Sequence, residues 1–187
     1  MKFFTRKWRN KVSIFLLLSF FSISLIPQIS AQDLKTGKYY QIIAKHSGKA
    51  LDVKVASKNN GGKIHQWDQH GEANQLFKLE EAGDNYYRII SKNSGKAFDI
   101  TGGPHKTENG VHLQQWDPVG GDNQLFQIID NGDGYFQLMA KHSQKVLDVY
   151  GSCKDNGATV IQYESTGSDN QLFKFVSVDD QDLGPEY

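Results

Sequence analysis

Short apolar runs separated by polar turns recur along most of this chain of 187 residues. Three of the runs open in the same way, with aromatic residues followed by β-branched or other apolar residues, at 39–43, 86–90 and 135–139. That composition favours a pleated, half-buried strand. Beyond residue 31, apolar residues nowhere keep the 3.6-residue period of an amphipathic helix. The pattern therefore predicts strands and no α-helix in this part of the chain.

Each opening run leads into a polar turn and then into a second short apolar run that contains an aspartate. A Gly- and Asn-rich loop follows, and a third run ends in an aromatic residue. The aspartates and aromatics are Asp52 and Trp67, Asp99 and Trp116, and Asp148 and Tyr163. The first two polar turns hold Gly48 and Gly95, which supply the left-handed backbone of a tight turn, but the third holds Gln144. Either the third turn carries strain or its type differs.

The string Asn-Gln-Leu-Phe closes each of these units, at 74–77, 123–126 and 170–173. The three copies stand 49 and 47 residues apart, which indicates an internal triplication. We expect repeats at about 39–84, 85–133 and 134–177. Four short strands in each copy predict twelve strands in a closed or nearly closed all-β architecture.

One repeat is longer than the others. Aspartate and aromatic are 15 residues apart in the first and third repeats but 17 apart in the second, whereas aromatic and asparagine are always 7 apart. The two additional residues therefore lie in the loop 101–109, which contains Pro104 and His105. Loops that grow while strands keep their length are where specificity usually varies.

The first 31 residues differ from the repeats. Five basic residues precede an apolar run of about 15 residues, and the segment ends in the small residue Ala31. This order predicts a secretory signal peptide over 1–31, cleaved after Ala31. The alternative, a membrane anchor, is disfavoured because the run is short for a bilayer core of about 30 Å. No membrane span is expected in the mature chain, which has a polar lead-in at 32–38 and an acidic, solvated tail at 178–187.

Removal of the signal peptide changes the charge of the chain. The full sequence balances 21 basic against 21 acidic residues, and the mature chain keeps 16 basic and 21 acidic residues. This net negative charge disfavours binding to nucleic acid, whose phosphates select clustered Lys and Arg. Cys153 is the only cysteine, so the fold has no intramolecular disulfide. Cys153 is either an ordinary loop residue or a thiol that reacts or links two chains.

The three Gln-x-Phe motifs, each preceded by an aspartate and an aromatic at fixed distances, resemble the ricin B-type lectin family. In that family, as in family 13 carbohydrate-binding modules, Gln-x-Trp recurs three times on a β-trefoil. Here phenylalanine replaces the tryptophan in every copy, at Phe77, Phe126 and Phe173. The resemblance covers 39–177 and implies a pseudo-threefold β-trefoil with four short strands per repeat. It also implies a non-catalytic lectin without a cofactor.

The resemblance implies a different role for each of the repeated residues. The phenylalanine of each motif is expected in the core, and the preceding glutamine is expected to tie loops together and to orient the aspartate. The aspartate, the aromatic and the asparagine are expected to face a sugar. An exposed ring packs on the apolar C–H face of a sugar, while carboxylate and amide bind its hydroxyls. Such sites are weak singly and gain by multiplicity.

The candidate carbohydrate-binding residues follow repeat by repeat. They are Asp52, His65, Trp67, Asn74 and Gln75 in the first repeat, Asp99, Gln114, Trp116, Asn123 and Gln124 in the second, and Asp148, Tyr163, Asn170 and Gln171 in the third. The family also uses a glutamine two residues before the aromatic, which is Gln114 in the second repeat but is replaced by His65 and Ile161 in the others. The second repeat is therefore the most complete and the third the least.

Other functions are less well supported. An interaction or inhibitor protein with vestigial sugar sites is the main alternative. An enzyme is disfavoured because the repeats fill the mature chain and no Gly-x-Ser-x-Gly, His-Glu-x-x-His or phosphate-binding loop occurs. Of the six histidines, only His46 and His142 share a repeat position, in turns, so no metal site is expected. Galactose-type sugars or a xylan-like polysaccharide are the expected ligands, and the sequence leaves open which sugar binds and whether a separate partner protein takes part.

Overall fold

The computed structural model describes residues 34–178, and twelve short strands form its regular structure. The predicted signal peptide and the tail beyond residue 178 lie outside the described residues. The strands are β1 (Tyr39–Ala44), β2 (Ala50–Val53), β3 (Gly62–Trp67), β4 (Phe77–Glu81), β5 (Tyr86–Ser91), β6 (Ala97–Ile100), β7 (Leu113–Trp116), β8 (Phe126–Asp130), β9 (Phe136–Ala140), β10 (Val146–Val149), β11 (Val160–Tyr163) and β12 (Phe173–Ser177).

The only helical pieces within 34–178 are 3₁₀ turns of three residues each, which confirms the prediction of strands without α-helix. They are η2 (Lys54–Ala56), η3 (Ala73–Gln75), η4 (Asp122–Gln124), η5 (Tyr150–Ser152) and η6 (Asp169–Gln171). None of the helices in this described part of the chain has the length and hydropathy needed to cross a membrane.

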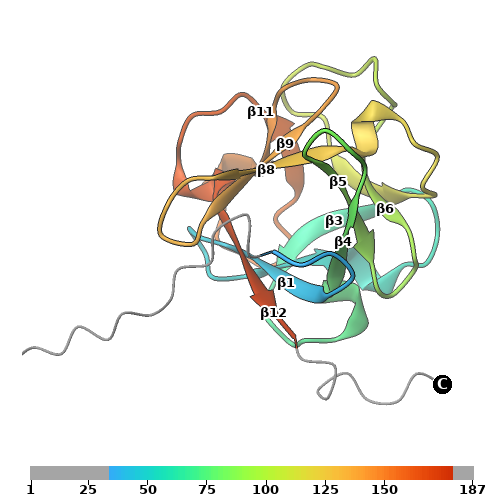
Figure 1. Ribbon diagram of the computed structural model, residues 1–187. Coiled ribbons are helices and arrows are strands. Elements are labelled where there is room, and N and C mark those ends of the chain that lie inside the picture. Colours follow the sequence, from blue (N-terminus) through green and yellow to red (C-terminus); the bar gives the residue numbers. More distant parts are fainter. Residues whose placement is uncertain (1–33, 179–187) are drawn as a thin grey trace, which may run out of the picture.

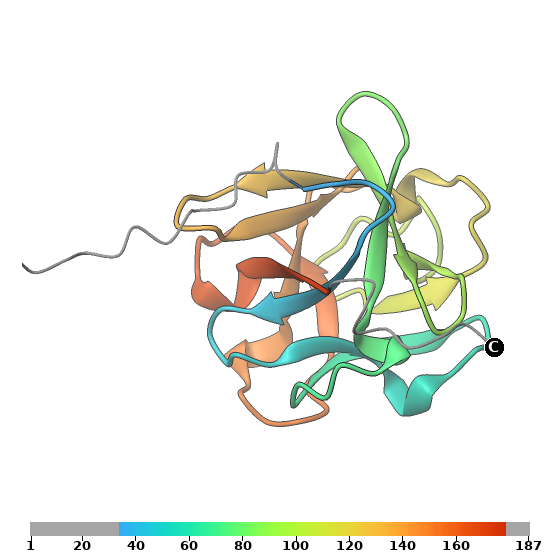
Figure 2. The same cartoon turned by 60° about the horizontal axis from the view of Figure 1, so that its bottom comes forward.

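Six of the strands close a barrel. Around the ring, β1 pairs with β4, β4 with β5, β5 with β8, β8 with β9, β9 with β12, and β12 with β1 again. The other six strands form the hairpins β2–β3, β6–β7 and β10–β11. These hairpins are joined to one another in two ways. β3 pairs with β7, and isolated bridges link His65 to Thr159 and His112 to Ile161. The ring and its three hairpins repeat around a pseudo-threefold axis (Figures 1 and 2), and the fold is a β-trefoil.

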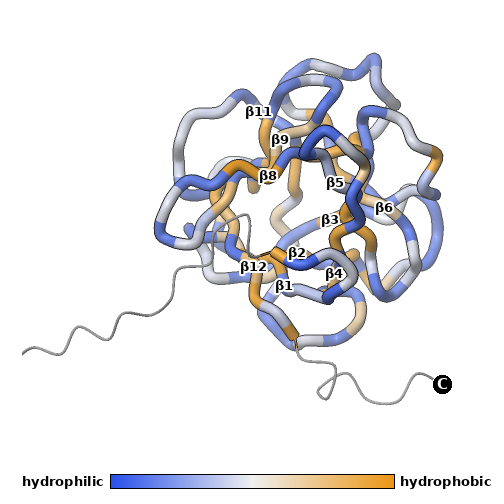
Figure 3. Tube along the Cα trace, viewed as in Figure 1, coloured by the Kyte–Doolittle hydropathy of each residue, from blue (hydrophilic) through white to orange (hydrophobic). Residues whose placement is uncertain are grey.

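Phenylalanines dominate the core. Phe77, Phe126 and Phe173 expose 1%, 0% and 0% of their surface, which confirms that the last residue of each tetrapeptide is a core residue. Phe98 joins the first two, with ring centroids 4.9 Å from Phe77 and 6.4 Å from Phe126. In Figure 3 the strands alternate between apolar and polar while the connecting loops are mostly hydrophilic. With no disulfide within the chain, this packing stabilises the fold.

A second buried glutamine in each repeat ties the repeats together, and the sequence reading missed it. Gln66 donates from Nε2 to the carbonyl oxygens of Cys153 (2.8 Å) and Asp155 (3.0 Å), and its Oε1 accepts from the Ser47 hydroxyl (2.8 Å). Gln115 and Gln162 repeat this pattern, each with two bonds to carbonyls of the preceding repeat and one from a serine of its own repeat. The signal was present, because a glutamine directly precedes the aromatic in every copy. The carbonyl of Cys153 is thus part of the scaffold.

The three polar turns share one geometry. The backbone N–H of Gly48, Gly95 and Gln144 each donates to the carbonyl four residues earlier at 2.9 Å, with φ of 70°, 71° and 57°. Gln144 therefore adopts the left-handed backbone that the other copies give to glycine, so the third turn carries the strain rather than a different type. His46 and His142 bond the carbonyls of Cys153 and Lys106 on neighbouring repeats. Both histidines thus serve the turns, as expected.

Candidate functional site

The register of each hairpin places the candidate residues on one face. In the second repeat, Asp99 pairs with Gln114, and Ala97 pairs with Trp116. Because side chains alternate along a strand, Asp99, Gln114 and Trp116 lie on the same side of the hairpin. The small Ala97 opposite the indole leaves room beside the ring. The first repeat pairs Asp52 with His65, and the third pairs Asp148 with Ile161.

Asp99 is the centre of a group of hydrogen-bonded polar side chains in the second repeat, which we call the floor of the site. Its Oδ1 accepts from Gln114 Nε2 at 2.9 Å, and its Oδ2 accepts from Asn123 Nδ2 and Gln124 Nε2, both at 2.9 Å. A carboxylate oxygen can accept two hydrogen bonds, so Oδ1 keeps one free direction. Asn123 Nδ2 also bonds the carbonyl of Ile100 at 3.1 Å, which fixes the amide with its oxygen turned away from Asp99.

The loop that follows Trp116 is held by its neighbours. Gln124 Nε2 donates to the Asp117 carbonyl at 2.9 Å, and Gln124 Oε1 accepts from the backbone of Val119 at 3.0 Å. The Asp117 carboxylate pairs with the Lys96 ammonium and accepts from the Asn60 amide of the first repeat, and both contacts lower the pKa of Asp117. The second site is therefore built on a loop that two repeats hold in place.

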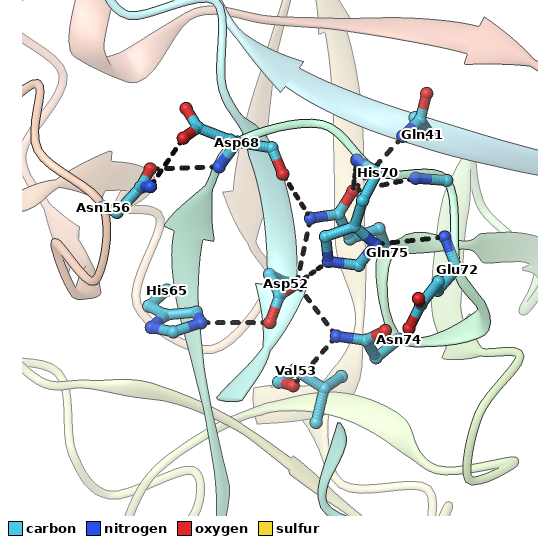
Figure 4. Close-up of polar contacts among 11 residues, drawn as sticks. Gln41, Asp52, Val53, His65, Asp68, His70, Glu72, Asn74, Gln75 and Asn156 are labelled. Carbon is cyan, nitrogen blue, oxygen red and sulfur yellow. Dashed lines mark hydrogen bonds and ion pairs between the residues drawn. The ribbon is translucent and has the colours of Figure 1, made fainter. Parts of the chain in front are cut away.

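Two histidines distinguish the floor of the first repeat (Figure 4). Asp52 Oδ1 lies 3.0 Å from His65 Nε2, and Oδ2 lies 3.2 Å from His70 Nε2. Oδ2 also accepts from Asn74 Nδ2 at 2.9 Å and Gln75 Nε2 at 3.0 Å. The ring of His65 stacks on Trp67 with centroids 5.4 Å apart. Four side chains thus surround this carboxylate, and the sequence reading missed the one that lies between the aromatic and the tetrapeptide, His70.

The floor of the third repeat has a different chemistry. Asp148 accepts from Gln171 Nε2 at 2.9 Å, but the position of Gln114 and His65 is taken by Ile161, which has no donor. Burial raises the pKa of the Asp148 carboxyl, against the lowering effect of the Gln171 and Asn170 amides. Asn170 Oδ1 accepts from the Ser168 hydroxyl at 2.7 Å, so this amide oxygen is already paired.

The glutamines of the three tetrapeptides are braces. Gln75, Gln124 and Gln171 are 0% exposed, and each donates both to the aspartate of its repeat and to a backbone carbonyl of the loop after the aromatic. This confirms the expected bracing role and leaves these three side chains no surface for a ligand. The asparagines are nearly buried as well, with 7%, 4% and 5% of Asn74, Asn123 and Asn170 exposed.

The aromatics supply the exposed apolar surface. Trp67 and Trp116 expose 40% and 39% of their area, which is high for such large rings, and Tyr163 is partly buried. Trp116 lines a hollow of about 520 Å³ together with Asp99, Gln114 and Asn123. Trp67 lines a hollow of about 300 Å³ together with Asp52, His65, His70 and Asn74. Each hollow combines an exposed indole with a fixed carboxylate and amide.

The candidate carboxylates lie one in each repeat. The three aspartates stand on three different hairpins, each with its own braces. Across residues 34–178, no group of three or more His, Cys, Asp or Glu side chains is arranged to hold a metal ion. The arrangement in the first and second repeats is suited to hydrogen bonding of hydroxyl groups beside an apolar ring face.

Comparison with known proteins agrees with this geometry. The family model described as "Ricin-type beta-trefoil lectin domain-like" matches residues 28–116, 101–163 and 122–183. Among solved structures, the designed threefold symmetric protein ThreeFoil is 43% identical, with a TM-score of 0.73 over 75% of this chain and 99% of its own. The agglutinin of Rhizoctonia solani is 24% identical, with a TM-score of 0.68 over 75% of this chain and 95% of its own, and shows the shared fold. No curated protein matches the chain.

A larger protein also contains the same fold. The exo-β-1,3-galactanase 1,3Gal43A of Clostridium thermocellum is 33% identical, with a TM-score of 0.74 over 78% of this chain. This chain spans only 31% of the length of that enzyme. The earthworm R-type lectin C-half, 24% identical with a TM-score of 0.60, covers 75% of this chain and 99% of its own, and its structure holds GalNAc.

Proposed function

This chain belongs to the family of ricin-type β-trefoil lectin-like domains, and from that premise we propose that it is a secreted, non-catalytic lectin that binds glycans. The hollow of the second repeat carries the proposal. There Asp99 and Asn123 present oxygen acceptors beside the exposed indole of Trp116. A pyranose offers hydroxyl donors on its rim and an apolar C–H face, which match these two surfaces.

The repeats are proposed to differ in strength. The second repeat has the larger hollow and a free direction at Asp99 Oδ1, so we rank it first. The first repeat has the second tryptophan and a smaller hollow whose carboxylate already accepts from four side chains. The third repeat combines a partly buried tyrosine with a paired Asn170 and ranks last. Several weak sites on one chain favour multivalent glycans over single sugars.

Galactose-type sugars are the first ligands to test. The GalNAc-bound earthworm lectin and the galactanase share the fold, and the Macrolepiota procera lectin, 19% identical, was solved with lactose. Galactose, N-acetylgalactosamine, lactose and xylan fragments are therefore the ligand panel. The two mature-chain tryptophans both stand at the proposed stacking position, so their fluorescence reports on binding directly.

The test compares Trp116→Ala with Tyr163→Ala by calorimetric titration of the best sugar in the panel. We expect Trp116→Ala to weaken binding about tenfold or more, equal to about 1.4 kcal/mol, and Tyr163→Ala to change it less than about threefold. Val176→Ala, an exposed residue of β12 outside the hollows, serves as the control. Equal losses in the two aromatic variants would contradict the ranking of the repeats.

A flat response to every sugar and to a glycan array would reject the lectin function. The alternative would then be an interaction or inhibitor protein on the same fold with vestigial sugar sites. Secretion is tested separately, because cleavage after Ala31 gives a mature chain that begins at Gln32. Mass spectrometry of the exported protein checks this end point, and retention of the first 31 residues would contradict it.

A further inference from the structure

The hollow of the second repeat differs from that of the first in its volume and in the loops that line it. Both hollows are lined by the aspartate, the asparagine, the aromatic and the residue two positions before it. Beyond these shared positions, the smaller hollow is lined by Lys54, Val55 and His70, and the larger one by Thr101, Gly102, Gly103, Pro104, Val119 and Gly121. The difference in volume, about 520 against 300 Å³, therefore goes with the loops after β6 and β7 rather than with the shared positions.

The buried glutamines show where the two additional residues of the second repeat lie. Gln162 Nε2 donates to the Lys106 carbonyl at 2.8 Å, as Gln115 Nε2 donates to the Ser57 carbonyl at 2.8 Å. Lys106 and Ser57 are thus equivalent positions. Between these anchors and the preceding strand, residues 101–105 stand where the first repeat has only the 3₁₀ turn η2 (Lys54–Ala56). The insertion lies within 101–105, which narrows the range that the spacing alone gave.

The inserted segment forms a wall of its own. Gly102 and Gly103 both have left-handed backbones, with φ of 85° and 81°, and Gly103 N–H donates to the Ile100 carbonyl at 3.4 Å. Lys106 N–H closes the turn on the Gly103 carbonyl at 3.1 Å. Pro104 is the second residue of this turn, a position that suits its fixed φ, and it lines the hollow. The sequence after β6 thus places a rigid apolar ring beside the site.

The loop after β7 supplies a second apolar surface. Val119 is 72% exposed and lines the hollow, whereas the equivalent His70 of the first repeat turns to Asp52 and takes up a place on the floor. Among the described residues no hydrogen-bond donor lies within bonding distance of Asn123 Oδ1. Gly121 keeps that oxygen open, because a Cβ there would come within 2.5 Å of it. The hollow therefore has unused acceptors and two apolar walls beyond Trp116.

We propose that the second repeat binds two adjacent sugar units, one on Asp99 and Trp116 and the next between Pro104 and Val119, while the first repeat binds one. The inference rests on the proposed lectin function and adds its substrate class, a disaccharide or longer glycan. The second unit contributes through apolar contact of its ring face with Pro104 and Val119. Its own hydroxyls remain toward the solvent.

The experiment isolates the second site with Trp67→Ala and Tyr163→Ala together and titrates galactose against lactose, and xylose against xylobiose. In this background we expect the better disaccharide to bind about tenfold more tightly than its monosaccharide, equal to about 1.4 kcal/mol. Replacing residues 101–105 by Lys-Val-Ala, the sequence of η2, should abolish that preference and leave the monosaccharide affinity within about threefold. Val119→Ser should reduce the preference in part, and Val176→Ser should leave it unchanged.

Each outcome decides the proposal. Equal affinity for monosaccharide and disaccharide in the isolated second site overturns it, as does a loop replacement that keeps the preference, and in both cases monosaccharide binding shows that the lectin function stands. No binding of any sugar overturns both. Circular dichroism verifies that the loop replacement is folded, and if it is not, Val119→Ser and Pro104→Gly carry the test. An unchanged preference in these two variants then overturns the proposal.

Discussion

The sites of the second and third repeats share a scaffold and differ in what surrounds the carboxylate. Both aspartates accept from a buried tetrapeptide glutamine at 2.9 Å. Asp99 has Gln114 as a further donor, whereas Asp148 faces Ile161. Gly121 leaves the Asn123 oxygen open, whereas Ser168 binds that of Asn170 at 2.7 Å. A triplicated fold can thus keep its frame unchanged while single residues open or close each copy of the site.

The largest effect is expected where the repeats are alike. Gln115→Ala and Gln162→Ala each remove three hydrogen bonds of a buried side chain, two of them to the preceding repeat, and leave a cavity. We expect each to lower the free energy of unfolding by about 3 kcal/mol. Urea denaturation measures both, with the exposed Gln69→Ala as control. If the two losses of stability differ by more than about 1.5 kcal/mol, the glutamines do not contribute equally, and the scaffold differs between repeats as the sites do.

The two aspartates should respond differently to removal of their charge. Both oxygens of Asp99 accept hydrogen bonds, so Asp99→Asn must turn an amide N–H group toward at least one of these donors. We expect it to lower the free energy of unfolding by about 2 kcal/mol. Asp148→Asn can keep an oxygen toward Gln171 and place its N–H group elsewhere, so the cost should stay within about 0.5 kcal/mol. Denaturation of both variants at pH 7 makes the comparison, and equal costs would contradict it.

The pH dependence provides a check on the Asp148 variant. Burial raises the pKa of Asp148 in the folded chain above the usual value of 3.8, so the folded state binds this proton more tightly than the unfolded state. The contribution of Asp148 to stability is therefore complete below the unfolded pKa and is lost as the pH rises through the folded pKa. Relative to wild type, Asp148→Asn should gain stability as the pH rises from 3.5 to 7, and an opposite slope would refute this.

A smaller effect is expected from exchanging Gly121 and Ser168. The two residues have nearly the same extended backbone, with φ, ψ of −67°, 148° and −78°, 154°, so neither replacement strains the backbone. A Cβ at position 121 would come within 2.5 Å of Asn123 Oδ1, so Gly121→Ser should displace this oxygen and weaken sugar binding in the second repeat about fivefold, equal to about 1 kcal/mol. Ser168→Gly should not weaken binding, and calorimetry of both variants tests the pair. A loss in Ser168→Gly instead would show that the serine is needed for the ligand.

The smallest effect is expected in the third polar turn. Gln144→Gly relieves a left-handed backbone at φ 57° but loses the bond from Gln144 Nε2 to the Lys141 carbonyl. We expect a net gain of about 0.5 kcal/mol, seen as a rise in Tm. The reverse change, Gly48→Gln, should lower the Tm. A lower Tm in Gln144→Gly would mean that the side-chain bond outweighs the strain.

The sequence predicted the frame of this protein correctly. The triplication, the twelve strands, the absence of α-helix in the described part, the core phenylalanines and the bracing glutamines all follow from patterns that recur in each repeat. These features depend on the local alternation of apolar and polar residues and on residues at fixed distances. Because both recur in three repeats, they can be recognised in the sequence. The longer loop was also located, because the fixed spacings on either side of it bound the insertion.

The tertiary structure decided what the repeats do not share. Three contacts depend on how loops fold over the hairpins. His70 bonds Asp52, Ser168 bonds Asn170, and Pro104 and Val119 line the same hollow. The glutamines that staple the repeats likewise bond carbonyls more than fifty residues away. Alternation along a strand says which face a side chain takes, but only the packing of distant loops sets which acceptors stay free.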